Sequence, residues 1–248
     1  MEKAEKNPMT FQEHFLELRK RIFFVIFFFV TFFCISYFFA ENIYQFLLQP
    51  FAEISLTHQN HKLIYTSPTE AFATYIKLSF YTSLFFSFPI FSAQVYLFLS
   101  PALYKNEKKN ILKIFFSTMF LFLFGAIFAY YFILPLALKF FASFETQGFS
   151  ELQKFPIQLE IKISEYLNFI LNLIFGFGVA FISPILLIFL IKIGLLSIDD
   201  LRKKRRYWIV FIFIIAAVLT PPDVLSQLSL AILMILLFEI VILICKKY

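Results

Sequence analysis

The stretch that decides the fold is residues 22–40, with the sequence IFFVIFFFVTFFCISYFFA. It carries no charge and has about the 20 apolar residues that an α-helix needs to cross the hydrocarbon core of a bilayer. Similar runs recur along the chain, which is 60% hydrophobic, contains 40 Phe and has a mean hydropathy of +0.81. The short alternating segments of a β-barrel are absent from the sequence. We therefore expect an all-α, polytopic membrane protein.

Six apolar runs are predicted to form the transmembrane helices of a single domain over residues 1–248. They lie at about residues 22–40, 71–99, 111–138, 166–191, 208–219 and 224–245. The run 208–219 would rise only about 18 Å as an α-helix, which is less than the roughly 30 Å of the hydrocarbon core. The last two runs therefore form either two short spans or a re-entrant hairpin. Before the second run, residues 43–54 predict a short interfacial helix with a break at Pro50.

The basic residues decide between these two topologies. Lys and Arg gather before the first run, between the second and third, between the fourth and fifth, and after the sixth. By the positive-inside rule, this pattern places both termini on the cytoplasmic or matrix side and favours six full spans. The membrane around the short fifth helix would then be thinned or tilted. The net charge of +6 follows from this topology and does not indicate nucleic-acid binding.

Two carboxylates lie among cations at the ends of predicted helices on that side. Glu17 is one helical turn from Arg21, and Glu107 has Lys105, Lys108 and Lys109 around it. One interpretation is a solvated cluster of ion pairs, each worth a few tenths of a kcal/mol. The other is a pair of carboxylates that receives two guanidinium groups, because arginine binds carboxylates through two parallel hydrogen bonds.

A second group of polar residues lies inside the apolar runs: Gln94, Asn168, Asn172, Gln227 and Glu239. They form either hydrogen bonds between helices or a polar patch that docks a partner helix. Asp223 follows two prolines and is predicted to cap the last helix. The sequence has no arrangement typical of a catalytic or metal site, so we expect neither an enzyme nor a cofactor.

Five motifs between His14 and Gln227 carry a resemblance to a known family, and the resemblance covers about residues 11–244. They are His14-x-x-Glu17-Leu18-Arg19-x-Arg21, Pro89-x4-Gln94-x3-Phe98-x2-Pro101-x-Leu103-Tyr104-x2-Glu107, Phe175-Gly176-Phe177-Gly178-Val179-Ala180-Phe181, Asp200-Leu201-Arg202-Lys203-Lys204-Arg205 and Leu219-Thr220-Pro221-Pro222-Asp223-Val224-x-Ser226-Gln227. Together and in this order they resemble the TatC family, the receptor subunits of the Sec-independent twin-arginine protein translocase.

The resemblance implies a function in protein transport. TatC-like proteins bind the twin-arginine signal peptides of folded cargo, recruit single-span TatA- or TatB-like subunits and use the protonmotive force. Glu17 and Glu107 match the carboxylates that receive the two arginines, and Arg19 and Phe98 match neighbouring positions of that surface. Positions important for activity or assembly correspond to Pro50, Asp223 and Gln227. The implied location is a bacterial plasma membrane or a mitochondrial inner membrane, with self-association of the subunit.

The chain departs from the family pattern at one position. The family usually has Glu directly after the position of Phe181, where it helps dock the partner helix, and this chain has Ile182. We therefore expect a partner without the matching polar residue, or docking shifted to Ser183 and Gln227. Two other functions remain open from the residues alone. A small-solute transporter would need a midplane site and internal repeats, and a membrane assembly subunit without a receptor role would leave Glu17 and Glu107 free to vary.

Overall fold

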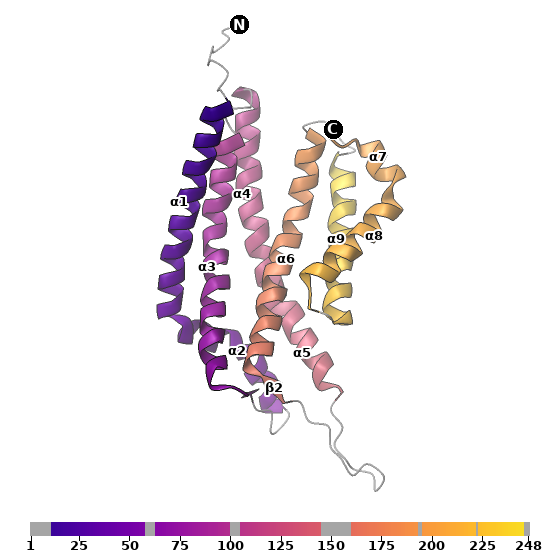
Figure 1. The fold of residues 1–248 in the computed structure, drawn as a ribbon. Helices are drawn as coiled ribbons and strands as arrows, with labels where there is room; N and C mark the ends of the chain where they lie inside the picture. The colour runs from indigo at the N-terminus through magenta and orange to yellow at the C-terminus, as the bar shows by residue number, and fades with distance from the viewer. Residues whose placement is uncertain are drawn as a thin grey trace.

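The computed structural model describes residues 11–57, 63–99, 105–144, 160–192, 195–221 and 223–245. Long helices dominate this part of the chain and lie side by side as a bundle (Figure 1). They are α1 (Phe11–Phe38), α2 (Ala40–Thr57), α3 (Pro68–Leu99), α4 (Lys105–Phe128), α5 (Leu134–Ala142), α6 (Ile163–Lys192), α7 (Ile198–Lys203), α8 (Arg205–Leu219) and α9 (Val224–Cys245), with a π-helical turn η2 (Ala129–Ile133) between α4 and α5. The all-α expectation is confirmed, apart from a two-residue parallel pairing of β1 (Leu63–Ile64) with β2 (Ile161–Lys162).

Five helical segments of the described chain are long and apolar enough to cross a membrane. They are Phe15–Phe38, Pro68–Val95, Phe115–Ala142, Ile163–Ile191 and Val224–Cys245. Large apolar side chains cover their outer faces, including Phe23 and Phe27 at 66% exposure each, as expected of surface that faces lipid. The chain is therefore a multi-pass membrane protein. Helix α8 has 15 residues, a rise of about 22 Å, and its full crossing of the bilayer stays a prediction.

The helices place two chemically different ends on the bundle. Helices α1, α4 and α8 begin at one end, where α3, α6 and α9 finish, and we call this the N-terminal end (Figure 1). The opposite end holds α2, the two short strands and the last turn of α5. Helix α1 packs along α3, and α6 lies at the centre, against α3, α4, α8 and α9.

Small residues let α4 and α6 approach closely, as is common between membrane helices. A Cβ on Gly125 would lie 2.7 Å from the carbonyl oxygen of Phe177, and one on Gly178 would lie 2.8 Å from a ring carbon of Phe122. Gly176 has the same relation to the end of α8, where a Cβ would lie 2.7 Å from the carbonyl oxygen of Leu219. The glycines of α6, together with Gly125 of α4, therefore let α4 and α8 pack closely against α6.

The predicted break at Pro50 is wrong, because α2 continues through it. Proline has no N–H, so the carbonyl oxygen of Phe46 lacks its usual helical donor. The hydroxyl of Tyr130, from η2, donates to this oxygen at 2.7 Å, and the Tyr130 ring stacks on the Phe46 ring at 4.8 Å. Membrane helices tolerate proline where a neighbouring element satisfies the freed group in this way.

The third apolar run also differs from the single helix that the sequence predicts. It consists of α4, η2 and α5, and the N–H of Leu134 donates to the carbonyl oxygen of Ala129, five residues back. Pro135 follows directly and has no N–H to give to the helix. The π-turn, which carries Tyr130, therefore lies where the regular helical hydrogen bonds are interrupted.

Candidate functional site

Glu17 and Arg21 form an ion pair one turn apart on α1. The Nε of Arg21 donates to Oε1 of Glu17 at 3.1 Å, and a terminal nitrogen of Arg21 donates to the same oxygen. The two side chains are only 20% and 24% exposed, for Arg21 and Glu17 respectively. The sequence predicts this pair from its spacing, but it does not predict the burial.

Arg21 also fixes α1 to the last turns of α3. Its other terminal nitrogen donates to Oε1 of Gln94 at 3.1 Å, and the first donates to the carbonyl oxygen of Leu97 at 3.2 Å. Gln94 therefore makes a hydrogen bond between helices, which is one of the two roles predicted for it. The guanidinium contacts three groups at once, so the position of the Glu17 carboxylate is held from both helices.

The two oxygens of Glu17 differ in their surroundings. Oε1 accepts both bonds from Arg21, whereas Oε2 is buried and has no hydrogen-bond partner among the described residues. A buried acceptor without a donor costs about 1–3 kcal/mol. The site therefore gains from any ligand that presents a donor to Oε2, and a guanidinium presents several in one plane.

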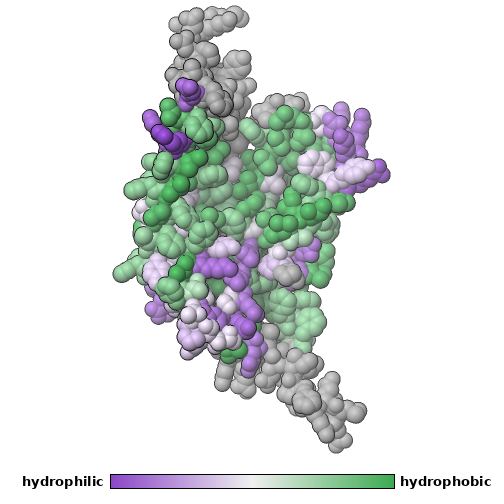
Figure 2. Space-filling view, viewed as in Figure 1, coloured by the Kyte–Doolittle hydropathy of each residue, from purple (hydrophilic) through white to green (hydrophobic). Residues whose placement is uncertain are grey.

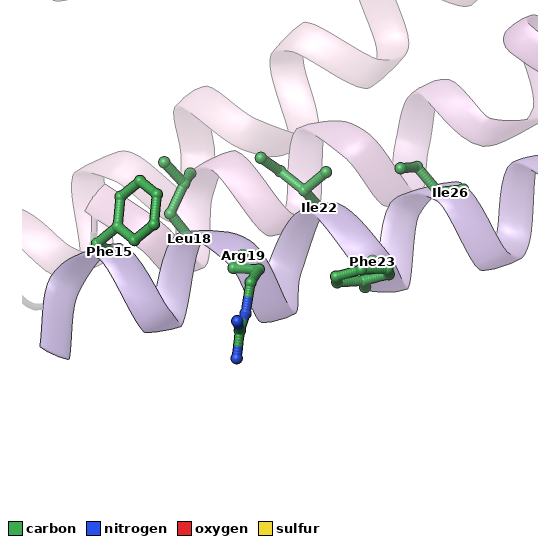
Figure 3. Close-up of a pocket in the computed structure, with 6 residues that line it drawn as sticks. All are labelled: Phe15, Leu18, Arg19, Ile22, Phe23 and Ile26. Atoms are coloured by element: carbon green, nitrogen blue, oxygen red, sulfur yellow. The ribbon is translucent and has the colours of Figure 1, made fainter. Parts of the chain in front are cut away.

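Arg19 and Phe98 lie at the same end but are not brought together with Glu17. Arg19 projects from α1 away from the neighbouring helices, beside a hollow of about 160 Å³ lined by α1 residues that include Phe15 and Phe23 (Figure 3). Phe98 is half-buried in the last turn of α3, next to Leu97, whose carbonyl contacts Arg21. A ligand that touched both Glu17 and Arg19 would have to pass around α1.

Glu107 lies in the first turn of α4, at the N-terminal end. Its side chain is outside the part of the chain that the structure describes. The backbone places it at the same end of the bundle as Glu17 (Figure 1). The pairing of the two carboxylates thus stays a prediction.

Comparison with known proteins identifies the family. A family model described as "Sec-independent protein translocase protein (TatC)" matches residues 13–232. The chain belongs to the TatC family. It is similar to TatC of Rickettsia prowazekii (47% identical, covering 96% of this chain and 92% of that protein). It is also similar to a protein of Reclinomonas americana described as an uncharacterized tatC-like protein (39% identical, covering 92% and 84%).

A solved structure matches the whole bundle. The crystal structure titled "Twin Arginine Translocase Receptor- TatC in DDM" superposes with a TM-score of 0.78 at 35% identity, and covers 94% of this chain and 99% of that one. The expected resemblance to TatC is confirmed, and the chain is a subunit of a Sec-independent protein translocase.

The TatC motif between α8 and α9 forms a helix cap, as predicted for Asp223. Its Oδ2 accepts the backbone N–H of Ser226 at 2.6 Å, and its carbonyl oxygen accepts the N–H of Gln227 at 3.1 Å. The other oxygen, Oδ1, and the hydroxyl of Ser226 are buried without a hydrogen-bond partner among the described residues. The Gln227 side chain is half-buried in the first turn of α9.

Glu239 makes an ion pair that spacing did not suggest. Its Oε2 accepts a hydrogen bond from Arg205 at 2.9 Å, between the first turn of α8 and the last turns of α9. The antiparallel hairpin brings these residues together across 34 positions. The sequence does hold a signal for this pair. The basic cluster that contains Arg205 comes directly before the fifth apolar run, and the sixth run, which contains Glu239, returns to the same end of the bundle.

Ile182, the position at which we expect this chain to depart from the family, lies on α6 with a half-buried side chain. It lies about 9 Å along the helix from Gly176, which contacts the end of α8. Asn172 of the same helix accepts a hydrogen bond from the Tyr81 hydroxyl at 2.9 Å, and therefore joins α6 to α3. The shift of partner docking to Ser183 and Gln227 stays a prediction.

Proposed function

We propose that this TatC-family chain is the receptor of a twin-arginine translocase and binds the two signal-peptide arginines at the N-terminal end of the bundle. It would then recruit single-span TatA- or TatB-like subunits for transport driven by the protonmotive force. The observation that carries the receptor role is the unequal use of the Glu17 oxygens: Arg21 holds one, and the other is buried with no partner among the described residues.

The arrangement favours arginine over lysine as the incoming group. A guanidinium can direct two N–H donors at one carboxylate, whereas an ammonium is a compact and strongly hydrated charge. Arg21 already offsets most of the Glu17 charge, so a general attraction for cations is weak at this position. What a ligand gains is a charge-assisted hydrogen bond to Oε2. The second arginine would pair with Glu107, in the first turn of α4 at the same end.

The test is site-specific crosslinking of a twin-arginine signal peptide to the protein in membranes. We expect Glu17→Gln and Glu107→Gln each to reduce the crosslink more than tenfold, because removing one partner of a buried charge pair costs about 2–5 kcal/mol. Replacing the two peptide arginines with lysines should have a similar effect.

The matched control is Glu41→Gln, an exposed carboxylate in the first turn of α2 at the opposite end, which should leave the crosslink unchanged. Crosslinks of wild-type strength in both Glu17→Gln and Glu107→Gln would show that these carboxylates are ordinary interfacial charges. The receptor proposal would then fail, although the family assignment would stand.

The α8–α9 hairpin is the surface that we propose for the partner helix. Its outer faces are apolar and exposed, with Val218 at 79% and Val224 at 68% on either side of the turn. Gln227 lies in the first turn of α9, beside this turn, and its side-chain amide supplies a hydrogen-bonding group for a polar residue of the partner helix. We expect Gln227→Leu to weaken crosslinking to the single-span subunit, whereas Gln45→Leu on α2 should not. Equal crosslinking in both variants would rule out this docking surface.

A further inference from the structure

A hollow of about 200 Å³ lies between α3 and α6, in the half of the bundle nearer the opposite end. Each helix lines it with residues of one face, among them Glu70, Thr74 and Lys77 on α3, and Ser164 and Asn168 on α6. Figure 2 shows hydrophilic surface over α3 and α6 here, within a largely hydrophobic face of the molecule. Polar residues at this depth are costly in a membrane and are a sign of a binding site.

Glu70 already accepts four hydrogen bonds. Its Oε1 accepts the Ser164 hydroxyl at 2.6 Å and the Ser164 N–H at 3.3 Å. Its Oε2 accepts the N–H of Thr66 at 2.7 Å and the Thr66 hydroxyl at 3.1 Å. All of these donors are neutral, so the carboxylate keeps its negative charge at the outer rim of the hollow.

Lys77 has no such partners in the part of the chain that the structure describes. Among the described residues, no carboxylate lies within ion-pair distance of its ammonium, and the side chains of Thr74 and Asn168 make no hydrogen bonds there. Lys77 is seven residues after Glu70 on the same helix, which is about 10 Å deeper along the axis. The hollow thus presents the Lys77 ammonium and two polar side chains without hydrogen bonds among the described residues, Thr74 and Asn168. The Glu70 carboxylate lies nearer the aqueous side.

This order of charges matches one class of lipid. In a phospholipid with an ethanolamine headgroup, the phosphate lies at the boundary of the hydrocarbon and the primary ammonium extends toward water. We propose that the hollow binds a phosphatidylethanolamine-type lipid, with the phosphate on Lys77, Thr74 and Asn168 and the ammonium toward Glu70. The acyl chains would continue along the exposed apolar face of α3 beyond Lys77, where Phe80 is 47% exposed.

The same charges predict which phospholipid headgroups bind more weakly than ethanolamine. An anionic glycerol headgroup supplies the phosphate but places no cation near Glu70, so its binding should be weaker. A choline headgroup keeps the charge but replaces the three N–H donors with methyl groups, so it should also bind less well. This assignment concerns a different face and depth from the Glu17 surface and does not depend on the receptor proposal.

The experiment is native mass spectrometry of the full chain, purified from vesicles with equal parts phosphatidylethanolamine, phosphatidylglycerol and phosphatidylcholine. We expect one phosphatidylethanolamine to be retained preferentially. Lys77→Gln should reduce its retention about fivefold, the factor that corresponds to about 1 kcal/mol per cation near a membrane surface. Lys77→Arg should preserve it. Because Lys77 is exposed, both variants should fold, which circular dichroism can check.

The matched control is Lys139→Gln, which removes an exposed cation from α5 at the same end without touching the hollow. An equal loss in both Lys→Gln variants would show a general surface-charge effect, and preferential retention of phosphatidylglycerol would contradict the charge order. Either result overturns the proposal. A third result would also overturn the proposal. If a single-span partner subunit protects Lys77 from an amine-reactive reagent and phosphatidylethanolamine does not, the hollow binds a partner helix and not a lipid.

Discussion

The hydroxyl of Tyr130 replaces a hydrogen bond that Pro50 removes from α2, and Tyr130→Phe tests this directly. Tyr130 is only 6% exposed and donates to the carbonyl oxygen of Phe46 at 2.7 Å. Phenylalanine keeps the ring and its stacking on Phe46 but leaves the carbonyl without a donor. Such a buried, unsatisfied group costs about 1–3 kcal/mol, so we expect the free energy of unfolding to fall by about that amount.

A double-mutant cycle with Pro50→Ala isolates the cause. Alanine restores an N–H at position 50, and this N–H can donate to the same carbonyl oxygen within the helix. Tyr130→Phe should then cost about 0.5 kcal/mol or less in the Pro50→Ala background. The expected coupling energy between positions 50 and 130 is therefore about 0.5–3 kcal/mol, within the range found for residues in one network.

The assay is equilibrium unfolding in detergent, followed by the fluorescence of the single tryptophan, Trp208. The control is Tyr131→Phe, which makes the same chemical change at the next residue, whose side chain is 62% exposed. It should be close to neutral. If Tyr130→Phe destabilises the protein equally with Pro50 and with Ala at position 50, the hydroxyl does not act through the Phe46 carbonyl and the explanation of the unbroken α2 is wrong.

Three further predictions concern packing, capping and charge, and the same unfolding assay checks them. Gly125→Ala should destabilise the protein by about 1–3 kcal/mol, because the new Cβ would lie 2.7 Å from a backbone carbonyl of α6 that cannot move aside cheaply; a neutral result would mean that α4 and α6 can separate freely. Asp223→Ala should cost about 1 kcal/mol through loss of the α9 cap, and Asp223→Asn should recover most of it. Glu239→Gln should change stability by less than about 1 kcal/mol, since its ion pair with Arg205 is partly exposed; a larger loss that persists in high salt would contradict this.

The helices could be predicted from the sequence because the signal for a membrane span is local. A run such as residues 22–40 needs no knowledge of its neighbours to be assigned, since the bilayer supplies the same environment to every span. The cap at Asp223 was predictable for the same reason, because the cap and the N–H that it binds are three residues apart. Spacing and family motifs singled out Glu17 and Glu107, and their role as receptor carboxylates stays a proposal.

The features that the sequence did not predict depend on residues that are distant along the chain. A local rule breaks α2 at Pro50, and the hydroxyl that prevents the break comes from Tyr130 in another helix. No Lys or Arg lies within four positions of Glu239 in the sequence, whereas Arg205 reaches it across the hairpin. Spacing identified Glu17, but only the three contacts of Arg21 distinguish one oxygen from the other.

The two ends of the bundle differ in how completely their polar groups are hydrogen-bonded, and α3 connects them. At the opposite end, Glu70 binds α6 through Ser164, and hydroxyls of Tyr130 and Tyr166 bind carbonyls of α2 at 2.7 and 3.2 Å. These bonds fix α2, α3 and α6 to one another, so the far end of α3 is a rigid base. At the N-terminal end, α1 and α3 share the single guanidinium of Arg21, and one carboxylate oxygen beside it is left without a partner among the described groups. A binding group is most effective when a rigid scaffold holds it and its own hydrogen bonds are incomplete, and Glu17 meets both conditions at the N-terminal end.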